Sequence, residues 1–304
     1  MRSTLGWVAV ILGASVSTFW AFWGTLEDFH EGWFSAKLGE NLLWSLAYLT
    51  PMLLTMAMAL LALQWPRFGG AVYTTIGLCF AIWVLWGRAI TVALVLSWFP
   101  LTFLLAGIGL LFWFGRVQTR RWARRLIIGV PLLTVIAFAI EPVLRIAGRI
   151  DDGDRSARRV DGRGVSLLWA PEGPGWVRDS HAACGWQEAM RRCSLLSADG
   201  TSLADSPQNI WRLPSIDEAV RSVARHGRNC EGVWNPISER ASYVTRPDKE
   251  SPLWDTTSPI IYWWTGTQKD DAHAYRIVYD GGVFLNDKSL RMGSLGFRAV
   301  KEAR

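Results

Sequence analysis

Residues 126–147 read LIIGVPLLTVIAFAIEPVLRIA and divide the chain into two unlike halves. Upstream lies an apolar, tryptophan-rich stretch interrupted by short charged loops, and downstream lies a polar stretch with no long apolar run. An apolar run of this length is typical of a helix that spans a membrane. The sequence therefore predicts a multi-pass membrane region over residues 1–148, a charged linker over 149–164 and one soluble domain over 165–304.

The charge of the chain is unevenly distributed. The 304 residues carry a net charge of +6, and residues 1–148 hold ten basic and five acidic side chains. The remaining residues hold 22 basic and 21 acidic side chains, which are interspersed. Because a nucleic-acid-binding surface needs clustered basic residues, we expect no nucleic-acid partner. The positive excess belongs to the membrane region.

About five helices are expected to cross the bilayer, because lipid offers backbone groups no hydrogen-bond partner outside a helix. The first apolar segment ends in the bulky run Phe19-Trp20-Ala21-Phe22-Trp23, so we interpret it as a retained anchor and not as a cleaved signal. The break at Ser97-Trp98-Phe99-Pro100 is weak, so four to six spans stay open. The proposed spans cover roughly residues 5–24, 42–63, 71–92, 98–113 and 126–147.

Basic residues in short loops predict the orientation of these helices. The loop after the second span carries Arg67, and the loop after the fourth carries five arginines between Arg116 and Arg125. Such clusters stay in the cytoplasm. With five spans, the N-terminus is then cytoplasmic and everything after Ala147 is periplasmic or extracellular. We expect the protein in the inner (cytoplasmic) membrane of a bacterium.

Three charged residues lie inside the proposed spans: Arg88, Glu141 and Arg145. A charge within lipid is costly and is usually paired or close to the interface. Arg88 and Glu141 would lie at similar depth and are a candidate intramembrane pair. Arg145 is four residues from Glu141, so it can pair with it along one helix face or reach the interface. So few intramembrane charges argue against a transport function.

The soluble half has the pattern of an α+β domain. Residues 165–169 predict a short strand, and Trp186–Cys193 have helical spacing. Ser215 followed by Glu218 is the capping-box arrangement that begins a second helix. Strand-like runs follow, with a hairpin turn at Asp280-Gly281-Gly282. We therefore expect two helices and a small antiparallel sheet, with strands at residues 260–265, 274–280, 283–285 and 297–300.

The soluble half carries, in order, Trp186-Gln187-Glu188-Ala189 with Cys193, the run Trp211–Glu218, the run Tyr262–Thr267, a glycine hairpin turn and the run Gly296–Val300. This order of motifs resembles the Lcl C-terminal-like domain, a bacterial domain of unknown function. The resemblance covers about residues 165–301 and implies a C-type-lectin-like fold, and the closing Gly-Phe-Arg is also similar to the sulfatase-modifying-factor domains. Members often close with a cysteine, whereas here Phe297-Arg298 leads to Ala299-Val300. We interpret the motif residues as structural: Trp186, Trp211, Arg212, Leu213, Pro214, Gly296, Phe297 and Arg298.

A binding surface is expected on the segment between the second helix and the late strands. Residues 231–259 are rich in Pro, Ser, Thr and Trp and lack a long periodic element, and loops on a rigid scaffold concentrate binding residues. Trp263 and Trp264 alternate on a strand, so one of them is expected to point outward. The candidate ligand-binding residues are Trp234, Asn235, Trp254, Trp263 and Trp264.

Three cysteines in an exported domain predict one disulfide and one free thiol. The favoured pair is Cys193–Cys230, and Cys184–Cys193 is the alternative. His181, His226 and His273 are scattered without ligand spacing, so we expect no metal site and no cofactor. No nucleophile–base pair is evident from the sequence.

These features predict a non-enzymatic protein of the cell envelope that binds or senses a glycan or a protein through its exported lectin-like domain. The alternatives are an accessory subunit of a secretion or polysaccharide complex, or an envelope enzyme with the sulfatase-modifying-factor-like fold.

Overall fold

The structure is a computed structural model that describes residues 2–86, 91–176 and 183–303. The chain forms two compact units, which we describe separately. The first unit comprises Met1–Gly32 and Gly39–Leu144, and the second comprises Trp33–Leu38 and Arg145–Arg304.

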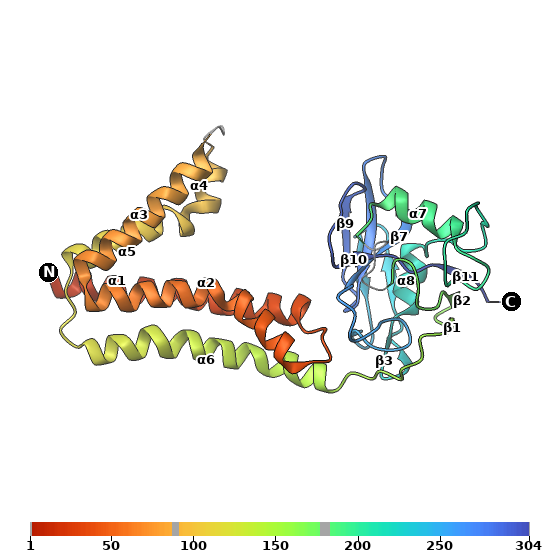
Figure 1. Ribbon diagram of the computed structural model, residues 1–304, viewed down its shortest axis with the longest axis horizontal. Coiled ribbons are helices and arrows are strands. Elements are labelled where there is room, and N and C mark those ends of the chain that lie inside the picture. The colour runs from red at the N-terminus through yellow and green to blue at the C-terminus, as the bar shows by residue number, and fades with distance from the viewer. Residues whose placement is uncertain (1, 87–90, 177–182, 304) are drawn as a thin grey trace. The chain divides into compact units, whose positions relative to one another are not determined.

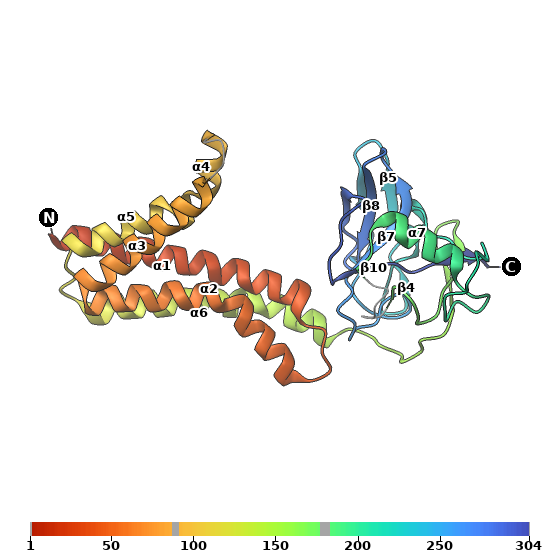
Figure 2. The same ribbon diagram turned by 45° about the horizontal axis from the view of Figure 1, so that its top comes forward.

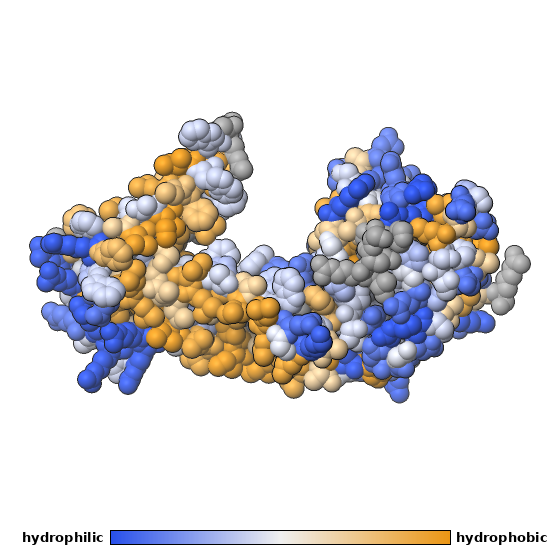
Figure 3. Space-filling model, viewed as in Figure 1, coloured by the Kyte–Doolittle hydropathy of each residue, from blue (hydrophilic) through white to orange (hydrophobic). Residues whose placement is uncertain are grey.

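Helices make up the first unit (Figure 1). Four of them, among the described residues, are long and apolar enough to cross a membrane: α1 (Arg2–Glu27), which continues into a π-helical turn (Asp28–Gly32), α2 (Leu38–Gln64), α3 (Pro66–Leu85) and α6 (Arg120–Ala147). Apolar side chains cover much of the outside of this unit, as Figure 3 shows in orange. Such a surface suits lipid and not water. The predicted first, second and fifth spans are confirmed as apolar helices.

The boundary between the third and fourth predicted spans differs from the expectation. Helix α3 ends at Leu85, before the predicted end at residue 92. The chain then forms α4 (Val92–Trp98), a 3-10 turn (Phe99–Leu101) and α5 (Phe103–Phe114), and α4 and α5 are bent by 54°. Pro100 lies in the 3-10 turn between the two helices, and its missing backbone N–H removes one α-helical hydrogen bond there. The two segments together would count as one broken span, which gives up to five.

Small residues let the helices of the first unit approach closely. A Cβ on Gly69 would lie 2.2 Å from Ala62 Cα, and one on Gly70 would lie 2.7 Å from the Gly109 carbonyl oxygen. The Tyr73 hydroxyl donates to the Thr55 carbonyl at 2.9 Å, which links α3 to α2. Close packing of small residues with a few interhelical hydrogen bonds is the usual way helices associate in lipid.

A four-stranded sheet forms the centre of the second unit (Figure 1). Its order is β10 (Leu295–Gly296), β7 (Tyr262–Gln268), β8 (His273–Val278) and β9 (Val283–Asp287). The β7–β8 and β8–β9 pairs are antiparallel, but β10 pairs with β7 in parallel. The sheet is therefore mixed, and not purely antiparallel as the sequence suggested, because the short β10 arrives from a loop and not from a hairpin.

A second, three-stranded sheet corrects the assignment of residues 149–164 to a linker. Its order is β1 (Arg158–Asp161), β2 (Ser166–Trp169) and β11 (Val300–Glu302), all antiparallel. Val160 pairs with Leu167, and its side chain is buried. Val160 is therefore a core residue within a charged run, which the composition of the run does not reveal.

Two short helices and two small hairpins complete the second unit. Helix α7 spans Trp186–Leu195, and α8 spans Ile216–Ser222. The predicted capping box is confirmed, because Ser215 accepts from the Glu218 backbone N–H while Glu218 accepts from the Ser215 N–H. The hairpins are β3 (Ala224–Arg225) with β4 (Arg228–Asn229), and β5 (Val233–Asn235) with β6 (Arg240–Ser242).

Candidate functional site

Three of the tryptophans expected at a binding surface are core residues instead. Trp254, Trp263 and Trp264 are 3%, 2% and 0% exposed. The Trp254 and Trp263 rings stack with centroids 3.6 Å apart, while the Trp264 indole N–H donates to the Cys184 carbonyl at 3.0 Å. Alternation along β7 does send the two side chains to opposite faces, but both faces of the sheet are covered. The prediction that one of them points outward is wrong.

Arg298 lies within this aromatic core. Its Nε donates to the Ala170 carbonyl at 2.9 Å, and its Nη1 donates to the Pro252 and Leu253 carbonyls. The guanidinium carbon lies 3.7 Å from the Trp176 ring centroid. Burial lowers the pKa of Arg298 well below its ordinary value. Backbone carbonyls and an aromatic face therefore stabilise this cation and join three distant segments of the unit.

A buried charged cluster lies in the segment that the sequence suggested as a ligand-binding loop. Asp248 accepts from Arg149 at 3.1 Å and from Arg225 at 2.6 Å, and its side chain is fully buried. The Glu250 carboxylate accepts from the Ile150 backbone N–H at 2.7 Å. Charges removed from water persist only when they are paired. Residues 248–250 thus hold the segment that precedes β1 and do not face solvent.

Lys249 lies between these two acids and is 2% exposed. Its amino group donates to the Ser258 carbonyl. Burial, together with the positive charge of Arg149, lowers the pKa of Lys249 to about 7. Nothing in the pattern PDKES indicated a buried lysine, since lysine is almost never fully buried.

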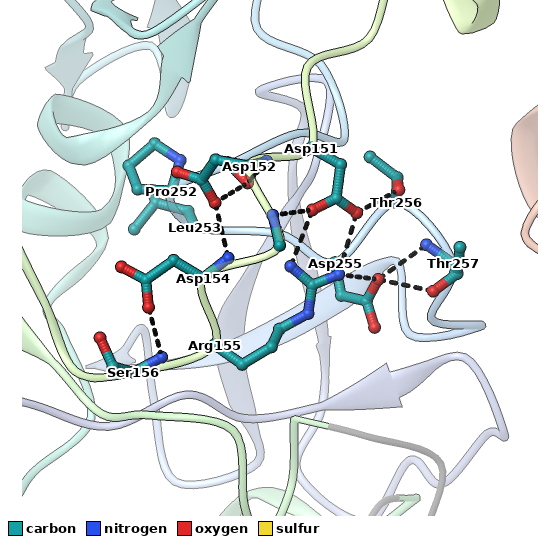
Figure 4. Close-up of polar contacts among 12 residues, drawn as sticks. Asp151, Asp152, Asp154, Arg155, Ser156, Pro252, Leu253, Asp255, Thr256 and Thr257 are labelled. Atoms are coloured by element: carbon teal, nitrogen blue, oxygen red, sulfur yellow. Dashed lines mark hydrogen bonds and ion pairs between the residues drawn. The ribbon is translucent and has the colours of Figure 1, made fainter.

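Residues 149–158, which we call the strap, form hydrogen bonds with the loop that contains Asp255 and Thr256 (Figure 4). Arg155 donates to both Asp151 oxygens at 2.8 and 2.9 Å and to Asp255 at 3.0 Å, and the Thr256 hydroxyl donates to Asp151 at 2.7 Å. The hydrogen bond from Arg155 holds the pKa of Asp151 well below its usual range. The strap holds three arginines and three aspartates and is neutral as a whole, so only the individual pairs, such as Arg155 with Asp255, are complementary, and the charge pattern of the sequence does not reveal them.

The hairpin of β5 and β6 is the part of the expected binding segment that does reach the surface. Trp234 is half-buried and lies edge-on to Tyr275, with ring centroids 5.5 Å apart. Asn235 is exposed, but its Oδ1 accepts from the Ile237 and Ser238 backbone N–H groups and so shapes the turn. At the turn, Ile237 is 94% exposed. Figure 2 shows β5 beside β8, the strand that carries Tyr275.

Most of the other motif residues connect elements of the second unit. The Trp186 indole donates to the Thr265 carbonyl at 2.7 Å, and the Trp211 indole donates to the Ser197 carbonyl at 2.9 Å. Arg212 binds Glu218 through two hydrogen bonds of 2.7 Å and Glu302 through one of 2.8 Å.

The remaining motif residues lie in tight backbone contacts. Leu213 and Phe297 are buried, and the Pro214 carbonyl accepts from Gly266 at 2.7 Å. A Cβ on Gly296 would lie 2.1 Å from the Gly175 carbonyl oxygen, so only glycine fits there.

The predicted Cys193–Cys230 disulfide is not present, and all three thiols of this unit are free and buried. Cys193 lies on α7, where burial and the neighbouring Cys184 raise its pKa. The Cys230 backbone N–H donates to the Val223 carbonyl. Burial, and after it the charge of Glu250, raises the pKa of Cys230 to about 11. The alternative pair, Cys184–Cys193, is not bonded either.

Of the predicted intramembrane pair, the structure describes Glu141. Arg88 lies outside the described residues. Arg145 pairs with Asp248 at 3.4 Å, and not with Glu141 four residues away. The Glu141 side chain is exposed on α6.

Among the described residues, no group of three His, Cys, Asp or Glu side chains is arranged to hold a metal ion. Asp270 accepts from the Ala272 and His273 backbone N–H groups, and Asp287 accepts from Ser289, as turn residues do.

Of the candidate binding residues expected from the sequence, those that the structure describes at the surface belong to the β5–β6 hairpin. No family model matches the chain, and no curated protein or solved structure was found that matches it.

Proposed function

We propose that this protein is a membrane-anchored, non-enzymatic binding module of the bacterial envelope, which recognises a protein partner through the β5–β6 hairpin of an exported domain. The observation that carries the proposal is the turn of this hairpin, where Ile237 is 94% exposed and Val233 and Val244 on the flanking chain are 44% and 75% exposed. Exposed aliphatic side chains on a rigid support favour a protein partner over a glycan.

Contacts between the hairpin and the elements beneath it hold the hairpin in one position, which favours a defined binding site. A Cβ on Gly232 would lie 2.0 Å from the Val220 carbonyl oxygen, so β5 passes directly against α8. Trp234 packs on Tyr275, and Lys269, which directly follows β7, binds Glu239 of the hairpin turn at 2.6 Å. Binding residues held by a rigid scaffold lose little conformational entropy when a partner binds.

The proposed location is the inner membrane, with the N-terminus in the cytoplasm and the second unit in the periplasm or outside the cell. It rests on the loop charges, because Arg67 and the cluster from Arg116 to Arg125 follow the second and fourth proposed spans. The similarity to the Lcl C-terminal-like domain, with its C-type-lectin-like fold, is part of the same proposal. The order of α7, α8 and the β7–β8–β9 hairpins supports it.

Site-specific photo-crosslinking in living cells tests the hairpin. A photo-reactive residue at Ile237 should give a discrete protein adduct, whereas the same residue at Ile210, an isoleucine of the same unit that is 39% exposed, should give none. Ile237→Asp should abolish capture of the adduct partner, and Ile210→Asp should not. Equal labelling at both positions would remove the support for this surface.

A glycan ligand would give a different pattern. In that case no protein adduct forms at residue 237, and retention on a glycan array is lost on Trp234→Ala but persists in Ile237→Asp. If the array and the crosslinking are both negative, the binding-module proposal fails.

A further inference from the structure

The first unit contains a large open cavity at one end of its helices. Its volume is about 1560 Å³, and it lies where α1, α3 and α6 begin and where α2 and α5 end. Four arginines line it: Arg2, Arg67, Arg116 and Arg120. The sequence suggested Arg67, Arg116 and Arg120 only as signals of orientation, and the structure brings them and Arg2 around one space.

No carboxylate balances these arginines. The first unit has five acidic residues, and none of them lines the cavity: Glu27, Asp28, Glu31, Glu40 and Glu141. Glu27 ends α1 and Glu40 begins α2, so each lies almost a full helix length away, on the order of 35 Å. Such a separation exceeds several Debye lengths in physiological salt. Within the described residues, none of the four guanidinium groups forms an ion pair.

The walls of the cavity are apolar and aromatic. Trp65, Phe68, Trp113 and Phe114 line it and are 58%, 62%, 44% and 62% exposed. Figure 3 shows hydrophilic atoms gathered at the end where α1 begins, next to the apolar surface of the helices. A ligand that fits must therefore present an anion to the arginines and apolar chains to these walls.

The backbone around the cavity is held in place by close packing. Arg116 N–H donates to the Arg2 carbonyl at 3.0 Å, which joins the loop after α5 to the start of α1. A Cβ on Gly115 would lie 2.5 Å from the Gly6 nitrogen, so the two chains touch through glycines. The positions of Arg2 and Arg116 are thereby fixed relative to each other at the backbone. Closely packed backbone segments therefore form this side of the cavity.

We propose that this cavity binds the phosphate headgroup of an acidic phospholipid, with the guanidinium groups on the phosphate and the acyl chains along Trp113 and Phe114. Arginine binds phosphate through two parallel hydrogen bonds, and its weak hydration suits the membrane interface. Basic pockets between membrane helices are a recurrent form of such recognition. The proposal concerns the first unit and does not depend on the function of the second.

Lipid titration of the full-length protein in detergent, followed by native mass spectrometry, tests the site. The probes are phosphatidylglycerol, phosphatidylcholine and inorganic phosphate. We expect one phosphatidylglycerol to be retained in preference to phosphatidylcholine. The double variant Arg67→Gln/Arg116→Gln should weaken that binding by about 30-fold.

The matched control is Arg121→Gln/Arg125→Gln, which removes the same charge from the same end of the unit but from residues that do not line the cavity. It should leave the affinity for phosphatidylglycerol unchanged, and Arg67→Lys/Arg116→Lys should retain part of it, which also verifies that the site folds. Equal losses in both Gln variants would mean diffuse attraction and overturn the site. Equal binding of the two lipids, or full displacement by inorganic phosphate at concentrations similar to the lipid's, would overturn the lipid as its ligand.

Discussion

Lys249 is buried, and the contribution of its burial to the free energy of unfolding depends on pH. Its ordinary pKa is 10.5, and burial lowers the pKa in the folded protein to about 7. Between these values the unfolded chain binds a proton that the folded chain does not. The stability associated with this group is therefore present at high pH and is lost as the pH falls toward 7.

We accordingly expect the free energy of unfolding of the second unit to rise from pH 7 to pH 8.5, and we expect Lys249→Met to remove this rise. The comparison between the two proteins cancels the contribution of the buried thiols and tyrosines, whose raised pKa values act at higher pH. A urea titration with a short deuterium pulse at fixed pH, read on the β7 and β8 peptides, measures it. Parallel pH profiles for the two proteins would contradict a neutral buried lysine.

Among the elements, the strap differs most from its prediction, because the sequence predicted a linker there and the structure shows a segment held by hydrogen bonds. Arg155 joins the strap to the loop before β7, because it contacts Asp151 and Asp255 together and its side chain is only 25% exposed. Arg159, four residues later, pairs with Asp161 at 3.4 Å with its side chain 59% exposed. Exposed pairs contribute little to stability, whereas partly buried charged hydrogen bonds contribute more.

Arg155→Met should therefore destabilise the second unit by about 1–3 kcal/mol and increase hydrogen exchange in both the strap and residues 251–258. Arg159→Met is the matched control and should leave exchange in both segments near the wild-type level. The same urea titration with deuterium labelling measures both variants. If they behave alike, residues 149–158 act as the linker that the sequence suggested.

At the scale of the whole molecule, the separation of charges predicts how the chain enters the membrane. The exposed arginines Arg67, Arg116 and Arg120–Arg125 lie at the helix ends opposite to Glu27 and Glu40. Translocating the arginine-rich end would expose several cations to lipid, so the acidic end should cross instead.

An alkaline phosphatase fused after residue 303 should therefore be active, and one fused in the loop at residue 118 should be inactive. Glutamine at all four arginines between residues 120 and 125 should reduce the difference between the two fusions. Activity only for the fusion at residue 118 would reverse the proposed orientation and, with it, the exported location of the hairpin.

Features with local causes follow from the amino-acid sequence alone. Apolar runs such as Leu126–Ala147 become helices because lipid leaves the backbone no other partner, and Ser215 with Glu218 satisfies the first N–H groups of α8 within one turn. The turn at Gly281, with φ of 85°, likewise follows from glycine's tolerance of that conformation. Local hydrogen bonds and chain geometry suffice for each of these features.

Only the tertiary structure decided which side chains face solvent. Strand alternation separates Trp263 from Trp264 but says nothing of what covers each face, and here Trp254 covers one face while the segment at Cys184 covers the other. Arg155 and Asp255 form a hydrogen bond although about one hundred residues of sequence separate them. Likewise, Arg2, Arg67 and Arg116 surround one cavity because helix packing brings together the starts of α1 and α3 and the loop after α5. Such contacts depend on the relative positions of whole elements, which no local pattern records.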